Sequence, residues 1–423
     1  MKWMYQFIYT LVWHIFILFW FLYQILFFWR HKTKWQEIKD RLGLFPKIKQ
    51  NHQPVLWFHA SSLGEVNSIL PLIQKMQKQQ HMTVILSTST SRGYTVALKK
   101  AENMHVHYIP WDISYIMQYA LKQIKPNLVV IFETEIWPNF LWTTKKNNIP
   151  TCIISARLSQ QSFPRYKKLR WFFKTVLSHV YIYTQTKQDE ERYIAIGASP
   201  KKTKTYGDIK LDNIALELPQ QKKDELQKIY GTLANVWVIG STHPTEEEML
   251  IPIHEYLQKY NVTTILAPRH LQRIPEITNY LQKKNIAYTL RSQLPQEKCE
   301  QLIILDTYGE LSQVYDLATI VFIGGTLANI GGHNLLESAA LGKPTIFGSH
   351  IQNSRHQAQM LLQNHAAIQI QNTEQLQNTI EQLINNQTER EKIKQNAQNI
   401  IRKNKGVLDQ YITTLLQHLR ETE

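Results

Sequence analysis

The segment Val321-Phe-Ile-Gly-Gly-Thr-Leu-Ala-Asn-Ile-Gly-Gly-His-Asn-Leu-Leu-Glu-Ser-Ala-Ala-Leu-Gly-Lys-Pro344 indicates the fold class of this chain. An apolar run ends in one glycine pair, and a second glycine pair leads into a helix-like Ala/Leu stretch. This order of strand, glycine-rich loop and helix is a recurring way of binding phosphate through loop amides and a helix N-terminus. Asn334 and Glu337 are three residues apart, so both could face one ligand. The pattern alone does not separate an anion-binding loop from a loop that binds nothing.

Short apolar runs alternate with helical stretches through most of the chain. This alternation predicts parallel sheets covered by helices on both faces. A Lys/Gln-rich segment from Leu216 to about Lys228 interrupts it and is interpreted as a connection between two doubly wound α/β domains, residues 31–215 and 216–423, the second ending in helices. The predicted strands are Pro54–His59, Thr83–Thr88, Leu128–Phe132, Thr151–Ser155 and Val180–Thr184, then Val236–Gly240, Thr263–Ala267, Leu302–Leu305, Ile320–Ile323 and Pro344–Phe347.

The composition of the 423-residue chain is that of a globular protein, with 43% hydrophobic and 19% charged residues. Its net charge of +15 favours an anionic partner, which could be nucleic acid, anionic lipid or a phosphorylated small molecule. The only cysteines, Cys152 and Cys299, argue against a disulfide scaffold and a thiolate zinc site. The histidines lack the spacing of metal ligands, so neither a metal ion nor a cofactor is expected.

The N-terminal segment from Trp3 to Trp29 is almost wholly apolar and aromatic, interrupted only by Gln6, Thr10, His14 and Gln24. It is long enough to cross a bilayer, and a basic stretch, Arg30 to Lys34, follows it. We therefore expect residues 1–30 to anchor the protein to a membrane, with the domains on the cytoplasmic side. A spanning helix and one lying in the membrane plane both fit this segment.

Polar residues follow the predicted strands, where ligands bind in open α/β sheets. Each group taken alone has an ordinary explanation as a helix cap or a solvated charge. Together they predict a cleft between two facing domains. The groups are Glu65, Glu133 with Glu135, Arg157, Ser241-Thr242-His243, Pro268-Arg269-His270 and Asp306 to Glu310.

Several of these groups belong to longer motifs, and their order along the chain resembles that of the Kdo transferases. This family adds 3-deoxy-manno-octulosonic acid (Kdo) from CMP-Kdo to lipid A precursors. The resemblance covers essentially the whole chain and implies the GT-B architecture of two Rossmann-like domains. It rests on the opening glycine segment and on the motifs His59-Ala-Ser-Ser-Leu-Gly-Glu65, Glu133-Thr-Glu-Ile-Trp-Pro-Asn139, Ser155-Ala-Arg-Leu-Ser159, Gly207-Asp-Ile-Lys-Leu-Asp212, Gly240-Ser-Thr-His243, Ala267-Pro-Arg-His270 and Asp306-Thr-Tyr-Gly-Glu-Leu311.

The resemblance also implies roles for individual residues. Glu65 takes the place of the catalytic base that removes the proton of the acceptor hydroxyl. Glu133 and Lys210 take places thought to support the transition state, and Lys210 would offset the charge gained by the leaving CMP. The implied CMP site comprises Pro268, Arg269, Tyr308, Gly309, Glu310, Asn334, Leu335, Leu336 and Glu337, with Ser241, Thr242, Gly325 and Thr326 as further contacts.

This sequence departs from the family pattern at Ser61 and Leu63, where valine is frequent, at Tyr308, where methionine is, and at Leu335, where proline is. These positions flank the implied functional groups without removing any of them. Nucleotide or acceptor preference could be affected.

The resulting expectation is an inverting, metal-independent glycosyltransferase, anchored to the cell inner membrane by residues 1–30. It would transfer Kdo from CMP-Kdo to a phosphorylated lipid A precursor such as lipid IVA in lipopolysaccharide core biosynthesis. An alternative within the same fold is a transferase or epimerase that uses a UDP-sugar. An alternative from another class is a basic, membrane-tethered nucleic-acid-binding protein, although carboxylates rather than exposed aromatics stand at the strand ends. No motif indicates how many Kdo residues would be added.

Overall fold

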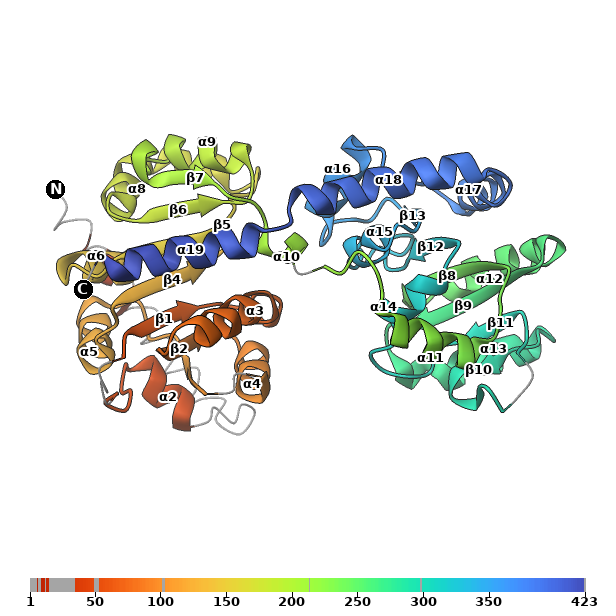
Figure 1. Ribbon diagram of the computed structural model, residues 1–423, viewed down its shortest axis with the longest axis horizontal. Helices are drawn as coiled ribbons and strands as arrows, with labels where there is room; N and C mark the ends of the chain where they lie inside the picture. The colour runs from red at the N-terminus through yellow and green to blue at the C-terminus, as the bar shows by residue number, and fades with distance from the viewer. Residues whose placement is uncertain are drawn as a thin grey trace. The chain divides into compact units, whose positions relative to one another are not determined.

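The computed structural model describes residues 6, 9–11, 13–14, 35–48, 53–100, 103–212, 214–296 and 299–421 (Figure 1). The chain divides into two compact units. Unit 1 consists of Met1–Asn213 and Asn404–Glu423, and unit 2 consists of Ile214–Lys403. Because α/β domains bury both faces of a parallel sheet, each unit has its own hydrophobic core.

Unit 1 is built on a seven-stranded parallel sheet in the order β3-β2-β1-β4-β5-β6-β7. The five predicted strands are confirmed, while the two edge strands were not predicted. Edge strand β3 has exposed side chains and β7 has only three residues, so neither forms an apolar run. The strands are β1 (Val55–His59), β2 (Thr83–Thr88), β3 (Met104–Tyr108), β4 (Leu128–Phe132), β5 (Thr151–Ala156), β6 (Tyr181–Thr184) and β7 (Thr203–Thr205).

Helices cover both faces of this sheet and enclose two clusters of buried apolar side chains. They are α2 (Trp35–Arg41), α3 (Leu63–Gln79), α4 (Ser91–Lys100), α5 (Ser114–Ile124), α6 (Pro138–Lys146), α7 (Phe163–Lys168), α8 (Arg170–Leu177), α9 (Lys187–Ala195), α10 (Ile209–Asp212) and α19 (Val407–Arg420).

Helix α19 belongs to unit 1, although the sequence assigned all residues after 215 to the second domain. Its apolar face, which includes Val407, Tyr411 and Leu415, is part of the same buried cluster as strands β1 and β4 (Figure 1). The predicted domain boundaries are therefore wrong for the last helix, because burial of its apolar face, rather than chain order, decides where it packs.

Unit 2 is built on a second seven-stranded parallel sheet, in the order β10-β11-β9-β8-β12-β13-β14. The five strands predicted here are confirmed. The strands are β8 (Asn235–Thr242), β9 (Val262–Pro268), β10 (Thr289–Leu290), β11 (Leu302–Ile304), β12 (Ile320–Ile323), β13 (Thr345–Phe347) and β14 (Ile368–Gln369). The helices are α11 (Gln220–Tyr230), α12 (Glu246–Leu257), α13 (Ile274–Lys283), α14 (Leu311–Val314), α15 (Leu336–Ala340), α16 (Arg355–Gln363), α17 (Thr373–Asn385) and α18 (Gln387–Lys403).

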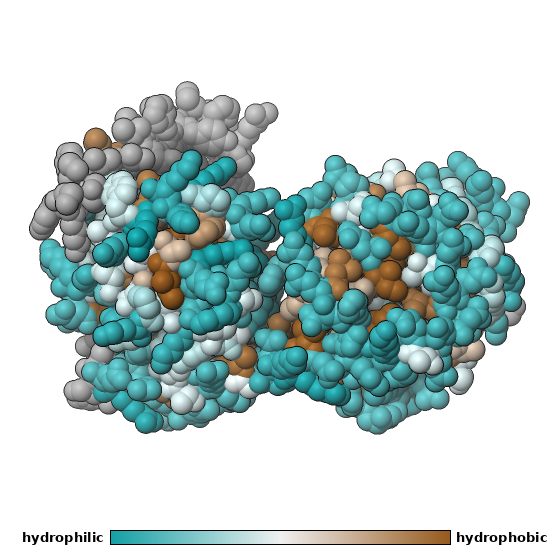
Figure 2. All heavy atoms as spheres, turned by 90° about the horizontal axis from the view of Figure 1, so that it is seen from above, coloured by the Kyte–Doolittle hydropathy of each residue, from teal (hydrophilic) through white to brown (hydrophobic). Residues whose placement is uncertain are grey.

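The Lys/Gln-rich segment interpreted as a connection is mostly helix α11 of unit 2, which buries Leu226 and Tyr230. On the face shown in Figure 2, the surfaces of both units are mostly hydrophilic, and apolar residues gather in patches. Most of the large apolar side chains of the sheets are fully buried.

Most of the predicted anchor, residues 1–30, lies outside the described residues. Within the described part of the chain, no helix is both long and apolar enough to cross a membrane. The few described anchor residues lie against unit 1. The side chains of Gln6 and Thr10 hydrogen-bond to that of Asn139, at 3.4 Å and 3.1 Å, and His14 lies 3.3 Å from the Tyr115 hydroxyl. Three of the four polar interruptions in the apolar segment thus contact the first domain.

Candidate active site

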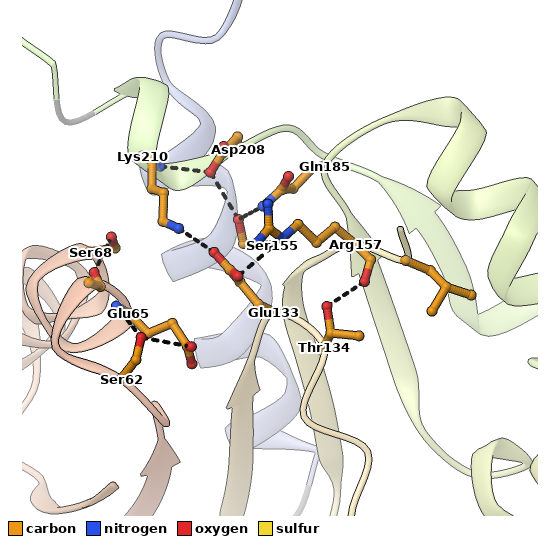
Figure 3. A network of polar contacts seen from close by, with 12 residues as sticks. Ser62, Glu65, Ser68, Glu133, Thr134, Ser155, Arg157, Gln185, Asp208 and Lys210 are labelled. Carbon is orange, nitrogen blue, oxygen red and sulfur yellow. Dashed lines mark hydrogen bonds and ion pairs between the residues drawn. The ribbon is translucent and has the colours of Figure 1, made fainter. Parts of the chain in front are cut away.

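A buried carboxylate with two cations lies at the carboxyl ends of the central strands of unit 1 (Figure 3). Glu133 directly follows β4 and is 6% exposed. It pairs with the ammonium of Lys210 on α10 and, at 3.2 Å, with the guanidinium of Arg157, which follows β5. The structure thus brings together Glu133 and Lys210, to each of which the family resemblance gave a role in supporting the transition state. Arg157 completes the group, since a buried carboxylate needs paired charge.

The backbone around Glu133 is held in an unusual conformation. Glu133 has a φ of +60° and Ser155 a φ of +49°, both in the left-handed region that non-glycine residues seldom adopt. The amide of Ser155 donates to the hydroxyl of Tyr411 on α19 at 3.0 Å, and that hydroxyl donates to the carbonyl of Gly207 at 3.1 Å. Such strained residues persist where neighbouring contacts hold them. Here the neighbour is the far end of the chain.

Asp208 links the loop carrying Lys210 to strand β5. Its carboxylate accepts from the amide of Lys210 at 2.9 Å and from the hydroxyl of Ser155 at 3.2 Å (Figure 3). The Ser155 hydroxyl in turn accepts from Gln185 at 3.3 Å. Burial raises the pKa of Asp208, while the contacts with Lys210 oppose the rise. The network fixes where the Lys210 ammonium can reach.

Glu65 lies in the first turn of α3, with Ser62 as the N-cap. Its carboxylate accepts from the amide of Ser61 at 2.8 Å and from the hydroxyl of Ser62 at 3.0 Å. Burial raises the pKa of Glu65, the Ser61 hydrogen bond lowers it, and the charge of Glu133 raises it again. The net result is a raised pKa, which brings a carboxylate closer to the range of an effective general base at neutral pH.

Glu135, two residues from Glu133, has the opposite tendency. Burial raises its pKa, but the neighbouring His59, whose Nε2 lies 3.7 Å from the carboxylate, and a hydrogen bond of 2.9 Å from Trp137 outweigh that, so the net pKa is lowered. Two carboxylates of unit 1 with pKa values shifted in opposite directions are typical of sites that separate acid and base roles.

In unit 2, the glycine-rich loop after β12 already surrounds a carboxylate of the protein. Glu246, the fully buried first residue of α12, accepts hydrogen bonds from five backbone amides, at 2.7 to 3.2 Å. Four amides of the loop are therefore not free to bind a phosphate, because a carboxylate of the chain already accepts their hydrogen bonds. The five amides belong to His243, Gly325, Thr326, Leu327 and Ala328.

The segment after the second glycine pair forms a helix of only five residues, α15. The amide of Leu335 donates to Gln357 at 2.9 Å and that of Leu336 to the side chain of Asn334 at 3.1 Å. The side chains of Leu335 and Leu336 are buried. Asn334 donates to Glu337 at 2.8 Å, so these two polar groups lie together and retain exposed atoms.

The remaining residues of the implied CMP site differ in exposure. Pro268 ends β9 and is buried, whereas Arg269 is exposed and its amide donates to the carbonyl of Thr242 at 3.0 Å. Tyr308 is 80% exposed, and Gly309 has a φ of +82°. Glu310 pairs with Arg291 through two contacts, at 2.9 and 3.2 Å, so its carboxylate is partly used within the unit.

The implied further contacts of the CMP site also serve the fold. The Thr242 hydroxyl donates to Glu247 at 2.7 Å, and the Thr326 hydroxyl accepts from the amide of Gly348 at 2.8 Å. A side chain at Gly324 would meet the carbonyl oxygen of Ser241 at 2.5 Å, which explains that glycine. No group of three or more potential metal ligands occurs among the residues that the structure places.

Sequence reasoning gave no role to several residues that shape these sites. Arg157 was named among the polar groups at the strand ends but was not placed beside Glu133. Tyr411 and Glu246 carried no local signal, because their contacts lie 256 and about 80 residues away along the chain.

Two family models match this chain, one within unit 1 and the other within unit 2. The sequence model of the family 3-Deoxy-D-manno-octulosonic-acid transferase (kdotransferase) matches residues 36–213, and that of glycosyl transferases group 1 matches residues 282–400. A 3-deoxy-D-manno-octulosonic acid transferase of Haemophilus influenzae is 30% identical over 91% of this chain and 92% of its own length. A bifunctional glycosyltransferase/methyltransferase of Fusobacterium nucleatum is 34% identical over 80% of this chain, which spans 54% of that relative.

Among solved structures, a UDP-GlcNAc 2-epimerase from Neisseria meningitidis shares the fold. Its TM-score is 0.56, and the match covers 83% of this chain and 99% of the epimerase chain. At 15% identity, this similarity concerns the fold alone.

Proposed function

The chain belongs to the 3-deoxy-D-manno-octulosonic-acid transferase family of glycosyltransferases, and from this premise we propose that it transfers Kdo from CMP-Kdo to a lipid A precursor, lipid IVA. The proposed reaction inverts the anomeric carbon and uses no metal ion. The observation that carries the proposal is the arrangement in unit 1, where Glu65 has a raised pKa beside the buried Glu133 with its two cations.

In the proposed reaction, an acceptor hydroxyl attacks the anomeric carbon and gives its proton to the carboxylate of Glu65. The bond between that carbon and the phosphate oxygen breaks, and CMP leaves with the bonding electrons. Lys210 supplies positive charge for the developing negative charge. Glu133 sets the position of this ammonium, and Arg157 keeps the buried carboxylate neutralised from its other side.

Unit 2 is the proposed donor-binding unit. Arg269 has an exposed guanidinium suited to a phosphate. Asn334 and Glu337, which hydrogen-bond to each other, offer donors and acceptors for ribose or base. Attachment to the inner membrane, with the domains on its cytoplasmic side, is part of the same proposal. The net charge of +15 supports an anionic lipid acceptor and membrane.

The decisive experiment incubates the purified chain with CMP-Kdo and lipid IVA and analyses the products by mass spectrometry, which also counts the Kdo residues added. Glu65→Gln should lower kcat about 100-fold or more, since general base catalysis typically contributes that much. Its affinity for CMP should stay unchanged, because CMP is assigned to unit 2. Exchange of the exposed Glu255 for Gln on α12 is the control and should leave transfer intact. Undiminished transfer by Glu65→Gln would remove that residue from its role.

The UDP-sugar alternative is supported only by the shared fold. Thermal unfolding in the presence of CMP or UDP separates the two donors. A larger stabilisation by UDP than by CMP would contradict the assignment of CMP-Kdo.

A further inference from the structure

Three imidazoles and one guanidinium gather at the carboxyl ends of β8 and β9. The Nε2 atoms of His243, after β8, and of His333, in the glycine-rich loop, are 2.7 Å apart. The planes of the two rings differ by 4°. His270, after β9, presents its ring edge-on to His243 at 5.5 Å between centroids, next to Arg269. Nothing in the reaction proposed above uses the three histidines.

The contact between the two Nε2 atoms requires that one ring carry a proton there and the other accept it. Burial, followed by the charges of His243, Arg269 and His270, lowers the pKa of His333 to about 4. Burial also lowers the pKa of His243, and the charges of His270 and Arg269 lower it further. The charges of Glu246 and Glu247 raise it, but the net pKa is lowered. The pair is therefore neutral at neutral pH while no anion is bound.

The two carboxylates whose charges act on His243, those of Glu246 and Glu247, already have partners within the unit. Glu246 accepts hydrogen bonds from four backbone amides of the loop and from that of His243, and Glu247 pairs with Arg273 at 2.7 Å. Among the residues that the structure describes, the guanidinium of Arg269 forms no ion pair. An exposed cation beside imidazoles that gain protons when a negative charge approaches is a favourable environment for an oxyanion.

We propose that Arg269, His270 and the His243–His333 pair form a binding site for an oxyanion of the donor, and that the pair takes up a proton when the anion binds. The anion is the phosphate of the nucleotide or the carboxylate of the transferred sugar acid, which share this chemistry. The assignment of the anion to a sugar-nucleotide donor rests on the proposed function. The binding of an oxyanion by these residues does not require that any sugar be transferred.

Isothermal titration calorimetry of the full chain with CMP, cytidine and CMP-Kdo, without acceptor, tests the site. If the phosphate is bound, His333→Gln and His270→Gln should lower the affinity for CMP about tenfold or more and leave the affinity for cytidine unchanged, since hydrogen bonds to charged groups have this strength. If the carboxylate is bound, only the affinity for CMP-Kdo should fall. His356→Gln, on the exposed face of α16, is the control. Unchanged binding of both CMP and CMP-Kdo to both variants would overturn the proposal.

The proton gives a second readout that simple structural damage would not reproduce. Titrations in buffers of different ionisation enthalpy should show proton uptake by the wild-type chain between pH 6 and 8, and none by His333→Gln. In this range the wild-type affinity, relative to that of His333→Gln, should fall as the pH rises, because the bound form loses the extra proton. Equal proton uptake by both proteins would contradict the role of the pair.

Because His270 is exposed, His270→Gln should fold normally even if His333→Gln proves unstable, which melting curves would show. Binding without any transfer would refute the proposed function and leave this site standing.

Discussion

At the scale of single residues, the raised pKa of Glu65 connects the geometry of unit 1 to a measurable pH profile. A base works only when ionised, so kcat/KM should fall as the pH drops through the pKa of Glu65. Because that pKa is raised, this acid limb should lie above the ordinary glutamate value of about 4.3.

Replacement of Glu133 by Gln tests the cause of this shift. The substitution removes a negative charge that raises the pKa of Glu65 and leaves the charges of Lys210 and Arg157 uncompensated, so the acid limb should move to lower pH. Glu135→Gln removes a weaker contributor and should move the limb less. Rate measurements between pH 4 and 9 would show the order. A limb that stays in place in Glu133→Gln would argue that another group titrates.

Glu246 shows what a residue pattern cannot reveal. The glycine-rich loop has the sequence of an anion-binding loop, and it does bind an anion, but that anion is a side chain of the same unit. Two glycine pairs fix the backbone shape and say nothing about which carboxylate or phosphate fills it. The imidazoles of His243, His270 and His333, rather than the four amides that Glu246 binds, are the groups that we assign to a ligand.

At the scale of elements, helix α19 contacts the segments of the candidate active site in unit 1 through one hydroxyl. Tyr411→Phe should leave the buried amide of Ser155 unpaired and lower the free energy of unfolding by about 1–3 kcal/mol. Because Ser155 and Gly207 flank Glu133 and Lys210, kcat should fall, while the KM for CMP-Kdo changes little.

The matched control is Tyr206→Phe. Its hydroxyl contacts Thr414 on the same helix at 3.0 Å, and it reaches neither Ser155 nor the Gly207 carbonyl. Denaturant unfolding and steady-state kinetics of both variants separate stability from positioning. Equal kcat values for the two variants would show that α19 acts only through stability.

Several elements were predictable because their residues form local patterns. Ten strands follow from apolar runs bounded by polar residues, since a parallel strand buried on both faces leaves that mark. Edge strands β3 and β7 leave none, because part of each is exposed. The sequence pattern also does not indicate which unit α19 packs on, since a helix with an apolar face can pack on either unit.

At the scale of the whole molecule, unit 2 is one continuous segment inserted into unit 1, since Ile214–Lys403 lies between its two parts. We expect a fragment of residues 214–403 to unfold cooperatively on its own and to gain thermal stability with CMP, because its core contains no residue of unit 1. Calorimetric melting with and without CMP would check this. A fragment that lacks cooperative melting would show that unit 2 depends on unit 1.

The candidate site could be predicted from the sequence only in part. Resemblance placed Glu65, Glu133 and Lys210, and the structure joins Glu133 to Lys210 directly and to Glu65 through its charge. Their environment depends on residues far apart along the chain, such as Tyr411 and Ser155, and only the folded chain brings these together.

The insertion of unit 2 also sets an order of events during synthesis. Unit 2 can fold on the ribosome as soon as residue 403 has emerged, whereas the core of unit 1 still lacks Val407, Tyr411 and Leu415 at that moment. Domains usually complete in the order of their synthesis. In this chain the first unit to begin is the last to close, and its exposed apolar face would be the natural target of chaperones until α19 arrives.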